Sequence, residues 1–371
     1  MAPHSIASRE LSGIFTPGFG SVFWAASPNL NLLIWIKIKI KIRIRSQQTR
    51  PKKKTCAPGR WFHPAGFCFF AAPQWCSVPG GEAMKIHIDG KYYEAKNAKI
   101  SVFDHGLLYG DGVFEGIRAY NGRIFKLAEH IQRLYWSAKA ILLQIPLSPE
   151  EMTRAVVETC RRNKIRDGYI RLVVTRGIGT LGVNPFTCKG PSVIIIADRI
   201  QLYPAAMYRR GLDLITVGTT RNLHSALNPA IKSLNYLNNI LAKIEAVNGG
   251  CEEAVILNAQ GYVAECSGDN IFIVKGGQLQ TPPLSAGALH GITRGVVMEL
   301  GRQNGLAVSE PNLTRYDLFN ADECFLTGTG AEIIAVVKID GRVIGSGQPG
   351  PVTEKLVGQY RQLTRASGEP I

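Results

Sequence analysis

The sequence predicts an α+β fold with a largely antiparallel sheet or barrel in its second half. Two observations support this prediction. Many short alternating runs are joined in pairs by turns that contain Gly, and amphipathic helical patterns stand between these hairpins. The chain has 371 residues, of which 45% are apolar and 19% are charged. This length is enough for two ordinary domains with sizeable buried cores.

Residues 1–83 differ in composition from the rest of the chain. They hold six Lys and five Arg against two acidic residues, so they carry +9 of the net charge of +15. Their segment IWIKIKIKIRIRS has neither the helical period of a transit peptide nor the continuous apolar core of a secretory signal. Because GGEAM precedes the first foldable pattern, we expect Met84 to be the true start. Residues 1–83 are then translated upstream DNA or a disordered leader.

The basic leader leaves a second class of function open, namely binding of nucleic acid or of a membrane surface. Salt-dependent DNA binding that is lost on deletion of residues 1–83 would support it. We expect no nucleic-acid partner and no membrane partner. No run of about 18 apolar residues, the length that spans a bilayer, occurs in the sequence.

The cysteines after the leader are widely spaced and include no CxxC pair, so they support neither a zinc site nor a disulfide framework. We therefore expect no metal and a reducing cytoplasmic location. These cysteines are Cys160, Cys188, Cys251, Cys266 and Cys324.

The first predicted domain, residues 84–205, mixes strands and helices. An Asp-Gly turn joins two alternating runs into a hairpin. Ser148 and Glu151 have the spacing of a capping box at a helix start. The patterns are a hairpin over 85–95, helices over 129–142 and 148–163, and strands over 169–177 and 192–198.

The second predicted domain, residues 206–371, begins within a connection at 200–211. Its hairpins have Gly at their turns, and its later helix ends at a Gly. The patterns are a strand over 212–220, a helix after Lys232, hairpins over 253–265 and 270–282, a helix over 291–305, and a strand with a hairpin over 323–345.

Lys232 is the residue whose chemistry needs an explanation. It lies where the turn at Asn228-Pro229 is expected to become a helix, and Tyr236 would lie one turn further on the same helix face. A lysine that forms a Schiff base with a cofactor needs four further groups. These are an anion pocket for a phosphate, a carboxylate facing a pyridine nitrogen, a donor to a phenolic oxygen, and a trap for a substrate carboxylate.

The sequence offers a candidate for each of these groups. Glu265 ends a hairpin strand, and the free N–H groups of Ile292 and Thr293 begin a helix. A Gly-Thr-Gly loop with Thr329 could point further N–H groups inward, and Arg133 could supply a fork for the phosphate. Each residue taken alone has an ordinary structural explanation, so only their combination predicts a site.

Seven segments, in this order, resemble the fold-type IV PLP-dependent aminotransferases, and most of all the branched-chain amino-acid aminotransferases. The resemblance runs from about residue 84 to about 365, and it rests on the joint pattern because no single motif is specific. It implies a smaller α/β N-terminal domain and a larger C-terminal domain with a pseudo-barrel. The segments are HGLLYGDGVFEGIRAY, EHIQRL, YIRLVVTRG, IKSLNYLNNILAKIEA, GYVAECSGDNIFIV, LHGITRG and ADECFLTGTGAEI.

The resemblance implies a role for each matching residue. Lys232 would bind pyridoxal 5'-phosphate covalently, Tyr236 would contact its phenolic oxygen, and Glu265 would contact its pyridine nitrogen. The remaining cofactor contacts would come from Arg133, Leu289, Ile292, Thr293 and Thr329. Substrate contacts would come from Phe114, Gly116, Arg118, Tyr169, Arg171, Tyr203, Thr329 and Gly330. Tyr109 and Val183 would reach across from a second subunit, so a homodimer or a higher homo-oligomer is expected.

The implied activity is that of a branched-chain-amino-acid transaminase. It would transfer the amino group of L-leucine, L-isoleucine or L-valine to 2-oxoglutarate, the last step of the biosynthesis of these amino acids and the first of their degradation. Two activities of the same fold type stay as alternatives. A D-amino-acid aminotransferase should show Arg-x-His after VTRG, where this chain has IGTLGVNPF. An aminodeoxychorismate lyase would use the same lysine, but the YIR and VFEGIRAY segments favour the transaminase.

The chain departs from the family pattern in two places. The segment from Lys232 to Tyr236 is one residue shorter than in some members, which could shift the start of the helix. Gly330 stands where many members have Ala, and since the backbone N–H is kept we expect little change.

Overall fold

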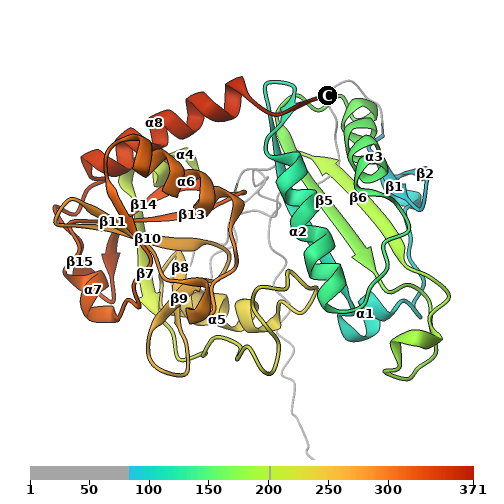
Figure 1. Ribbon diagram of the computed structural model, residues 1–371, viewed down its shortest axis with the longest axis horizontal. Helices are drawn as coiled ribbons and strands as arrows, with labels where there is room; N and C mark the ends of the chain where they lie inside the picture. The colour runs from blue at the N-terminus through green and yellow to red at the C-terminus, as the bar shows by residue number, and fades with distance from the viewer. Residues whose placement is uncertain (1–82, 200–201) are drawn as a thin grey trace, which may run out of the picture. The chain divides into compact units, whose positions relative to one another are not determined.

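The computed structural model describes residues 83–199 and 202–371 (Figure 1). The predicted leader, apart from Ala83, lies outside the described residues, and so do Ile200 and Gln201 of the predicted connection. Within the described ranges the strands form one sheet of seven and one of nine. The mixture of largely antiparallel strands and separate helices confirms the predicted α+β class. The predicted boundary at 205/206 stays a prediction.

The seven-stranded sheet is antiparallel at every pairing, in the order β16-β4-β3-β5-β6-β1-β2. The predicted hairpin at 85–95 is confirmed. Its turn residues Asp89 and Gly90 have φ of 49° and 80°, the left-handed conformation of a two-residue hairpin turn. The strands are β1 Lys85–Ile88, β2 Lys91–Glu94, β3 Gly112–Tyr120, β4 Arg123–Ile124, β5 Gly168–Thr175, β6 Ser192–Asp198 and β16 Glu369–Pro370.

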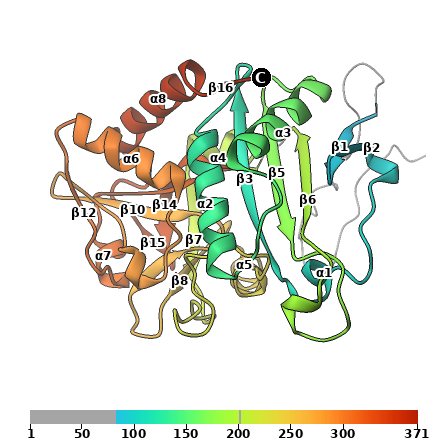
Figure 2. The ribbon, with the colours of Figure 1, turned by 45° about the vertical axis from the view of Figure 1, so that its right-hand side comes forward.

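Two helices pack against this sheet (Figure 2). α2 (Leu127–Ala140) lies on β3, and α3 (Pro149–Arg162) lies on β1, β5 and β6, while the short α1 (His105–Tyr109) precedes β3. The predicted capping box is confirmed, because Ser148 and Glu151 exchange side-chain to backbone hydrogen bonds. The helices therefore cover one face of the sheet at β3, and every second side chain of β3 points to the opposite face.

The nine-stranded sheet has the order β12-β11-β10-β13-β14-β7-β8-β9, with β15 added beside β14. The hairpins predicted over 253–265 and 270–282, and the one predicted at the end of 323–345, are confirmed as antiparallel pairs. The strands are β7 Leu212–Thr216, β8 Glu253–Leu257, β9 Val263–Cys266, β10 Asn270–Lys275, β11 Gln278–Gln280, β12 Ala307–Ser309, β13 Glu323–Gly328, β14 Glu332–Ile339 and β15 Arg342–Val343.

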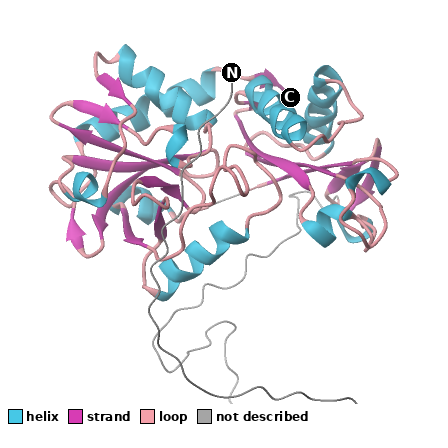
Figure 3. Ribbon diagram, turned by 60° about the horizontal axis from the view of Figure 1, so that its bottom comes forward, coloured by secondary structure: helices cyan, strands magenta, loops and turns pink. Residues whose placement is uncertain are grey.

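The central strands of this sheet are buried on both faces, which explains runs such as IFIV in β10. Ile271 and Ile273 belong to a core inside the curled sheet. Phe272 and Val274 belong to a second core with α6 and α8, which cover the other face (Figure 3). The helices of this half are α4 Ala205–Arg210, α5 Leu237–Asn248, α6 Ile292–Gln303, α7 Arg315–Phe319 and α8 Pro351–Ala366.

Two expectations about the second half need correction. The predicted connection at 200–211 contains the short helix α4. More importantly, the predicted helix after Lys232 begins only at Leu237, so neither Lys232 nor Tyr236 lies on a helix face. The physical reason is that this segment pairs with a strand: Ser233 forms a β-bridge with Val113 of β3.

No helix in the described ranges is both long enough and apolar enough to cross a membrane.

Candidate active site

A cavity lined by residues of both sheets brings most of the predicted site residues together. β3, α2 and β5 contribute one residue each, and the remaining ones come from the second half of the chain. The predicted residues that line the cavity are Gly116, Arg133, Tyr169, Lys232, Tyr236, Glu265, Leu289, Ile292, Thr293, Thr329 and Gly330.

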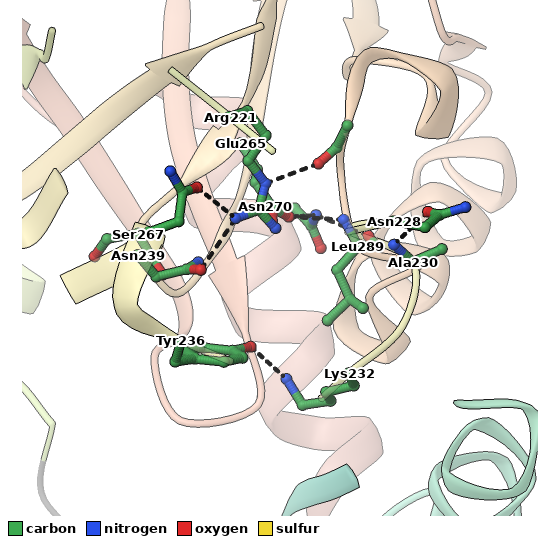
Figure 4. A network of polar contacts seen from close by, with 12 residues as sticks. Arg221, Asn228, Ala230, Lys232, Tyr236, Asn239, Glu265, Ser267, Asn270 and Leu289 are labelled. Carbon is green, nitrogen blue, oxygen red and sulfur yellow. Dashed lines mark hydrogen bonds and ion pairs between the residues drawn. The ribbon is translucent and has the colours of Figure 1, made fainter. Parts of the chain in front are cut away.

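The backbone around Lys232 is fixed by β3 and α2. Phe114 N donates to Lys232 O at 3.0 Å, and Lys232 N donates to Ser137 Oγ at 3.1 Å. The side chain then reaches into the cavity, where Lys232 Nζ donates to Tyr236 Oη at 3.1 Å (Figure 4). The Phe114 ring centroid lies 4.6 Å from the same nitrogen. Strand pairing, rather than a helix turn, thus sets the lysine and the phenol side by side.

At another wall of the cavity, Glu265 of β9 presents a buried carboxylate. Its Oε1 accepts from Arg221 Nη2 at 2.5 Å, and its Oε2 accepts from Leu289 N at 2.8 Å and from Asn270 Nδ2 at 3.1 Å (Figure 4). Burial raises the pKa of Glu265, and the Arg221 guanidinium opposes that shift. The three donors fix the carboxylate in one orientation.

Arg221 is itself held firmly behind Glu265. Its Nε donates to Gly287 O at 3.0 Å, and its Nη1 donates to Asn239 Oδ1 at 3.1 Å. Asn239 in turn donates to Ser267 O at 2.8 Å. The carboxylate is therefore backed by a connected polar network, which resists reorientation.

The opposite end of the cavity attracts anions. α6 begins at Ile292, and its N-cap Gly291 supplies no side-chain cap, so the first N–H groups of the helix are available to a ligand. Arg133 donates from Nη1 to His290 O at 2.7 Å and from Nε and Nη2 to the carboxylate of Glu115. A helix N-terminus beside a guanidinium is a suitable site for a phosphate or carboxylate.

The last residues of β13 and the glycine-rich loop that follows complete this end. Thr327 lines the cavity, and its buried Oγ1 has no hydrogen-bond partner among the residues that the structure describes. A Cβ on Gly328 would lie 1.9 Å from Asp269 Oδ1, so only glycine fits there without a shift. Burial, with Glu253 adding to it, raises the pKa of Asp269 to about 7. The end of β13 therefore offers a hydroxyl group that a ligand could bind.

Six predicted residues do not line this cavity. Phe114 packs edge-on against Tyr236, and the Arg171 guanidinium lies 4.7 Å from the Phe114 ring, so both stand directly behind the lining. Arg118 donates to Gly330 O at 3.2 Å, and within residues 83–199 and 202–371 its buried Nε has no partner. Tyr203 is buried in the core of the second sheet, where its hydroxyl faces Glu253 at 3.5 Å.

The other two are surface residues: Tyr109 and Val183 are 37% and 82% exposed. Their predicted contact with a second subunit stays a prediction.

Four residues that support the site are not singled out by the sequence patterns. Ser137 fixes the lysine backbone, Glu115 holds Arg133, and Arg221 and Asn270 hold Glu265. Glu115 and Ser137 could have been recognised from the sequence, since each is a polar residue at a position that the apolar pattern assigns to the buried face of β3 or α2.

The sequence matches the amino-transferase class IV family over residues 112–339. A protein of Methanocaldococcus jannaschii that is provisionally named a branched-chain-amino-acid aminotransferase is 53% identical over 280 residues, which are 76% of this chain and 96% of that protein. The crystal structure of the Escherichia coli branched-chain amino acid aminotransferase superposes with a TM-score of 0.75 at 36% identity, over 78% of this chain and 97% of that one.

A third similar structure is the branched-chain amino acid aminotransferase of Thermobaculum terrenum, solved in its PLP-form. It has a TM-score of 0.71 and 31% identity, over 76% of this chain and 94% of that one. The family match at residues 112–339 contains every residue that lines the cavity. The chain belongs to the class IV aminotransferases and, within them, to the branched-chain amino-acid aminotransferases.

Proposed function

We propose that this protein transfers the amino group of L-leucine, L-isoleucine or L-valine to 2-oxoglutarate, with pyridoxal 5'-phosphate held on Lys232. One observation carries the proposal. A single cavity has a cationic end at Arg133, an anionic wall at Glu265, and an amine beside a phenol between them. This order of charges is complementary to a phosphate at one end and a protonated pyridine nitrogen at the other.

The cavity fits this cofactor in two further respects. The uncapped start of α6 and the unpartnered Thr327 Oγ1 are polar groups in need of a ligand with acceptor oxygens. Tyr236 can donate to a phenolic oxygen, and Leu289 supplies an apolar side chain at the lining. We assign the cofactor contacts to Arg133, Lys232, Tyr236, Glu265, Leu289, Ile292, Thr293 and Thr329.

When bound, pyridoxal phosphate supplies an electron sink that stabilises negative charge on the substrate Cα. The chain's own residues supply the remaining chemistry. Lys232 Nζ, once it is released as a free amine, is placed to take the proton from the substrate Cα and later to return it. Tyr236, 3.1 Å from that nitrogen, orients it, and the fixed carboxylate of Glu265 would hold a proton on the pyridine nitrogen of the bound cofactor.

The substrate must meet both an apolar pocket and groups that bind carboxylates. The absence of a side chain at Gly116 leaves room on β3 for the hydroxyl of Tyr169, because a Cβ there would lie 2.0 Å from that hydroxyl. Arg118 has an unpartnered buried Nε–H, which supports it as a host for a substrate carboxylate, and Arg171 is the second candidate. We assign Thr329, Gly330, Phe114 and Tyr203 to the same pocket.

We further propose that a second copy of the chain completes the site through Tyr109 and Val183. The support is a group of large apolar side chains that are exposed around these two residues. They are Phe103, Leu107, Leu108, Leu181 and Phe186. Light scattering should give the mass of a dimer or a multiple of it, and Val183→Asp with Leu107→Asp should reduce the mass to a monomer. A monomeric parent protein would contradict the proposal.

We propose the cytoplasm as the compartment. The five cysteines in the described ranges are all free thiols, as expected under reducing conditions.

The activity is tested by supplying leucine with 2-oxoglutarate and, in parallel, D-alanine with 2-oxoglutarate. We expect glutamate to form from L-leucine, L-isoleucine and L-valine, with Lys232→Ala inactive. Faster turnover of D-alanine would indicate a D-amino-acid aminotransferase. Release of pyruvate from aminodeoxychorismate, without transamination, would indicate the lyase.

A further inference from the structure

A buried acidic group behind Arg133 has no role in the proposed chemistry. Glu115 lies on β3 with 0% of its side chain exposed, in the layer between β3 and α2. Such a layer disfavours a carboxylate unless the charge is fully paired. Its apolar neighbours in the same core are Val113, Ile117, Ile131 and Leu134.

Both carboxylate oxygens of Glu115 are paired. Oε1 accepts from Arg133 Nε at 2.7 Å, and Oε2 accepts from Arg133 Nη2 at 2.8 Å and from His130 Nδ1 at 2.8 Å. The two bonds to Arg133 form a parallel fork, which fixes the plane of the guanidinium. Burial alone would raise the pKa of Glu115, but the charges of Arg133 and His130 lower it to about 2.

These bonds also determine which hydrogens of Arg133 remain for a ligand. A guanidinium has five N–H groups, and the bonds to Glu115 and His290 O use one on each of its three nitrogens. One hydrogen on Nη1 and one on Nη2 are left. Arg133 lines the cavity beside Gly291 and Ile292, so an anion bound at the start of α6 can accept both.

Stability does not account for this arrangement well. A buried ion pair is commonly no more stabilising than apolar residues of the same volume, and the surrounding layer is apolar. A role in aiming Arg133 explains why a carboxylate stands at this position of β3. It also explains why His130, three residues before Arg133 on the same helix face, shares that carboxylate.

We propose that Glu115, supported by His130, is a positioning residue for the cofactor phosphate. It holds Arg133 in the orientation that directs two N–H groups at the phosphate, and it does not itself contact the cofactor. This inference rests on the proposed function, because it takes Arg133 to be a phosphate ligand.

The test uses the full chain with its cofactor removed, and it compares two ligands that differ only in the phosphate. The dissociation constants of pyridoxal 5'-phosphate and of pyridoxal are measured by calorimetry for the parent protein and for Glu115→Gln. We expect the substitution to weaken binding of the phosphorylated ligand by about 10- to 100-fold, by analogy with the loss of a group that orients a metal-binding side chain. Binding of pyridoxal should change little.

A matched control is Glu323→Gln. Glu323 is also a buried strand carboxylate, and it accepts hydrogen bonds from Val352 N and Thr353 N at the start of α8, away from the cavity lining. The control should leave the ratio of the two dissociation constants unchanged. If Glu115→Gln weakened both ligands equally, or neither, the role of Glu115 would be structural and the proposal would be wrong.

Arg133→Gln separates failure of this inference from failure of the proposed function. If Arg133→Gln lowers the preference for the phosphorylated ligand and Glu115→Gln does not, only the role of Glu115 is rejected. If neither variant lowers it, the phosphate site itself is misplaced. Should Glu115→Gln not fold, Glu115→Asp takes its place, since the shorter side chain keeps the charge but cannot reach both nitrogens of Arg133. As for Glu115→Gln, weaker binding of pyridoxal 5'-phosphate alone supports the proposal, and an equal effect on both ligands or on neither rejects it.

Discussion

Two buried Arg–Glu pairs stand at the two ends of the cavity, and they are arranged in opposite order. At the α6 end, Arg133 lines the cavity and Glu115 stands behind it. At the β9 end, Glu265 lines the cavity and Arg221 stands behind it. The side chain that faces the ligand is thus opposite in sign at the two ends, as a cofactor with a phosphate and a protonated pyridine requires.

The comparison separates two roles of a buried ion pair. In our proposal the outer member of each pair, which lines the cavity, meets the ligand, and the inner member fixes the direction of the outer side chain and balances its charge. Exchanging the order of a pair would leave the pairing intact but would present the wrong charge to the ligand. The arrangement therefore follows from binding and chemistry more than from stability, to which buried pairs contribute little.

The largest effect is expected at Glu265, the member that we propose to face the pyridine nitrogen. Glu265→Gln keeps the shape of the side chain but removes its charge, so the pyridine nitrogen is no longer held protonated. Turnover of leucine with 2-oxoglutarate should fall by about 100- to 1,000-fold, as when one preorganised electrostatic group is lost. Turnover close to that of the Glu323→Gln control would show that Glu265 does not face the nitrogen.

The next effect is on stability, and it is expected at Arg221, the inner member of the same pair. Arg221→Gln leaves the Glu265 carboxylate buried without its cation, so the free energy of unfolding should fall by about 3–5 kcal/mol. The double variant Arg221→Gln/Glu265→Gln should recover part of that loss and none of the activity. Urea unfolding of the parent, the two single variants and the double variant measures the coupling free energy between Arg221 and Glu265. Strict additivity of the two changes would show that the pair does not interact.

Asp269 is a third buried acid, and in the part of the chain that the structure describes no arginine pairs with it. Burial, with Glu253 adding to it and Lys243 and Lys232 opposing it, raises the pKa of Asp269 to about 7 from 3.8. A raised pKa stabilises the fold at low pH, and this stabilisation is lost as the pH rises from about 4 to about 7.

Asp269→Asn should remove this contribution. The difference in unfolding free energy between the variant and the parent should therefore shift in favour of the variant, by up to a few kcal/mol, between pH 4 and pH 8. The pKa of Glu115 is lowered, so the opposite sign is expected there. As the pH rises from about 2 to about 4.5, the difference in unfolding free energy between Glu115→Gln and the parent should shift in favour of the parent. Parallel curves for Asp269→Asn and the parent would rule out a buried proton on Asp269.

The smallest effects concern Gly328, the last residue of β13, and Gly330 in the loop that follows it. A Cβ on Gly330 would meet only Leu202 Cδ2, at 3.3 Å, whereas a Cβ on Gly328 would collide with Asp269. Gly330→Ala should change stability by less than about 0.5 kcal/mol and leave activity nearly intact. Gly328→Ala should weaken binding of pyridoxal 5'-phosphate measurably. Equal effects of the two substitutions would argue against close packing of Asp269 on this loop.

The fold was largely readable from the sequence where local patterns decide the structure. Hairpin turns such as Asp89-Gly90 and caps such as Ser148 depend on neighbouring residues, so their patterns are reliable. The segment around Lys232 depends instead on pairing with β3, 120 residues earlier in the chain, and no local pattern shows that. The predicted proximity of Lys232 to Tyr236 is confirmed, but the helix from which it was inferred is absent there.

The site was readable only in part, for a related reason. Residues that face the cavity, such as Arg133 and Glu265, belong to motifs that recur in the family. Their inner partners Glu115 and Arg221 are 18 and 44 residues away along the chain, and only the fold brings each pair together.

Apolar spacing also misleads at α5. Its residues Leu237, Ile240 and Ile244 have the period of a buried helix face, yet they are 49% to 65% exposed in the single chain. Periodicity identifies an apolar face but not what covers it.

The central claim is that Lys232 carries the cofactor between the two charged ends. The most direct measurement is reduction of the cofactor-loaded full-chain protein with borohydride, followed by digestion and mass spectrometry of the peptides. We expect one phosphopyridoxyl group, attached to Nζ of Lys232, and no such label at another lysine in the parent protein. A label on a different lysine, or an equal label in Lys232→Ala, would contradict the account.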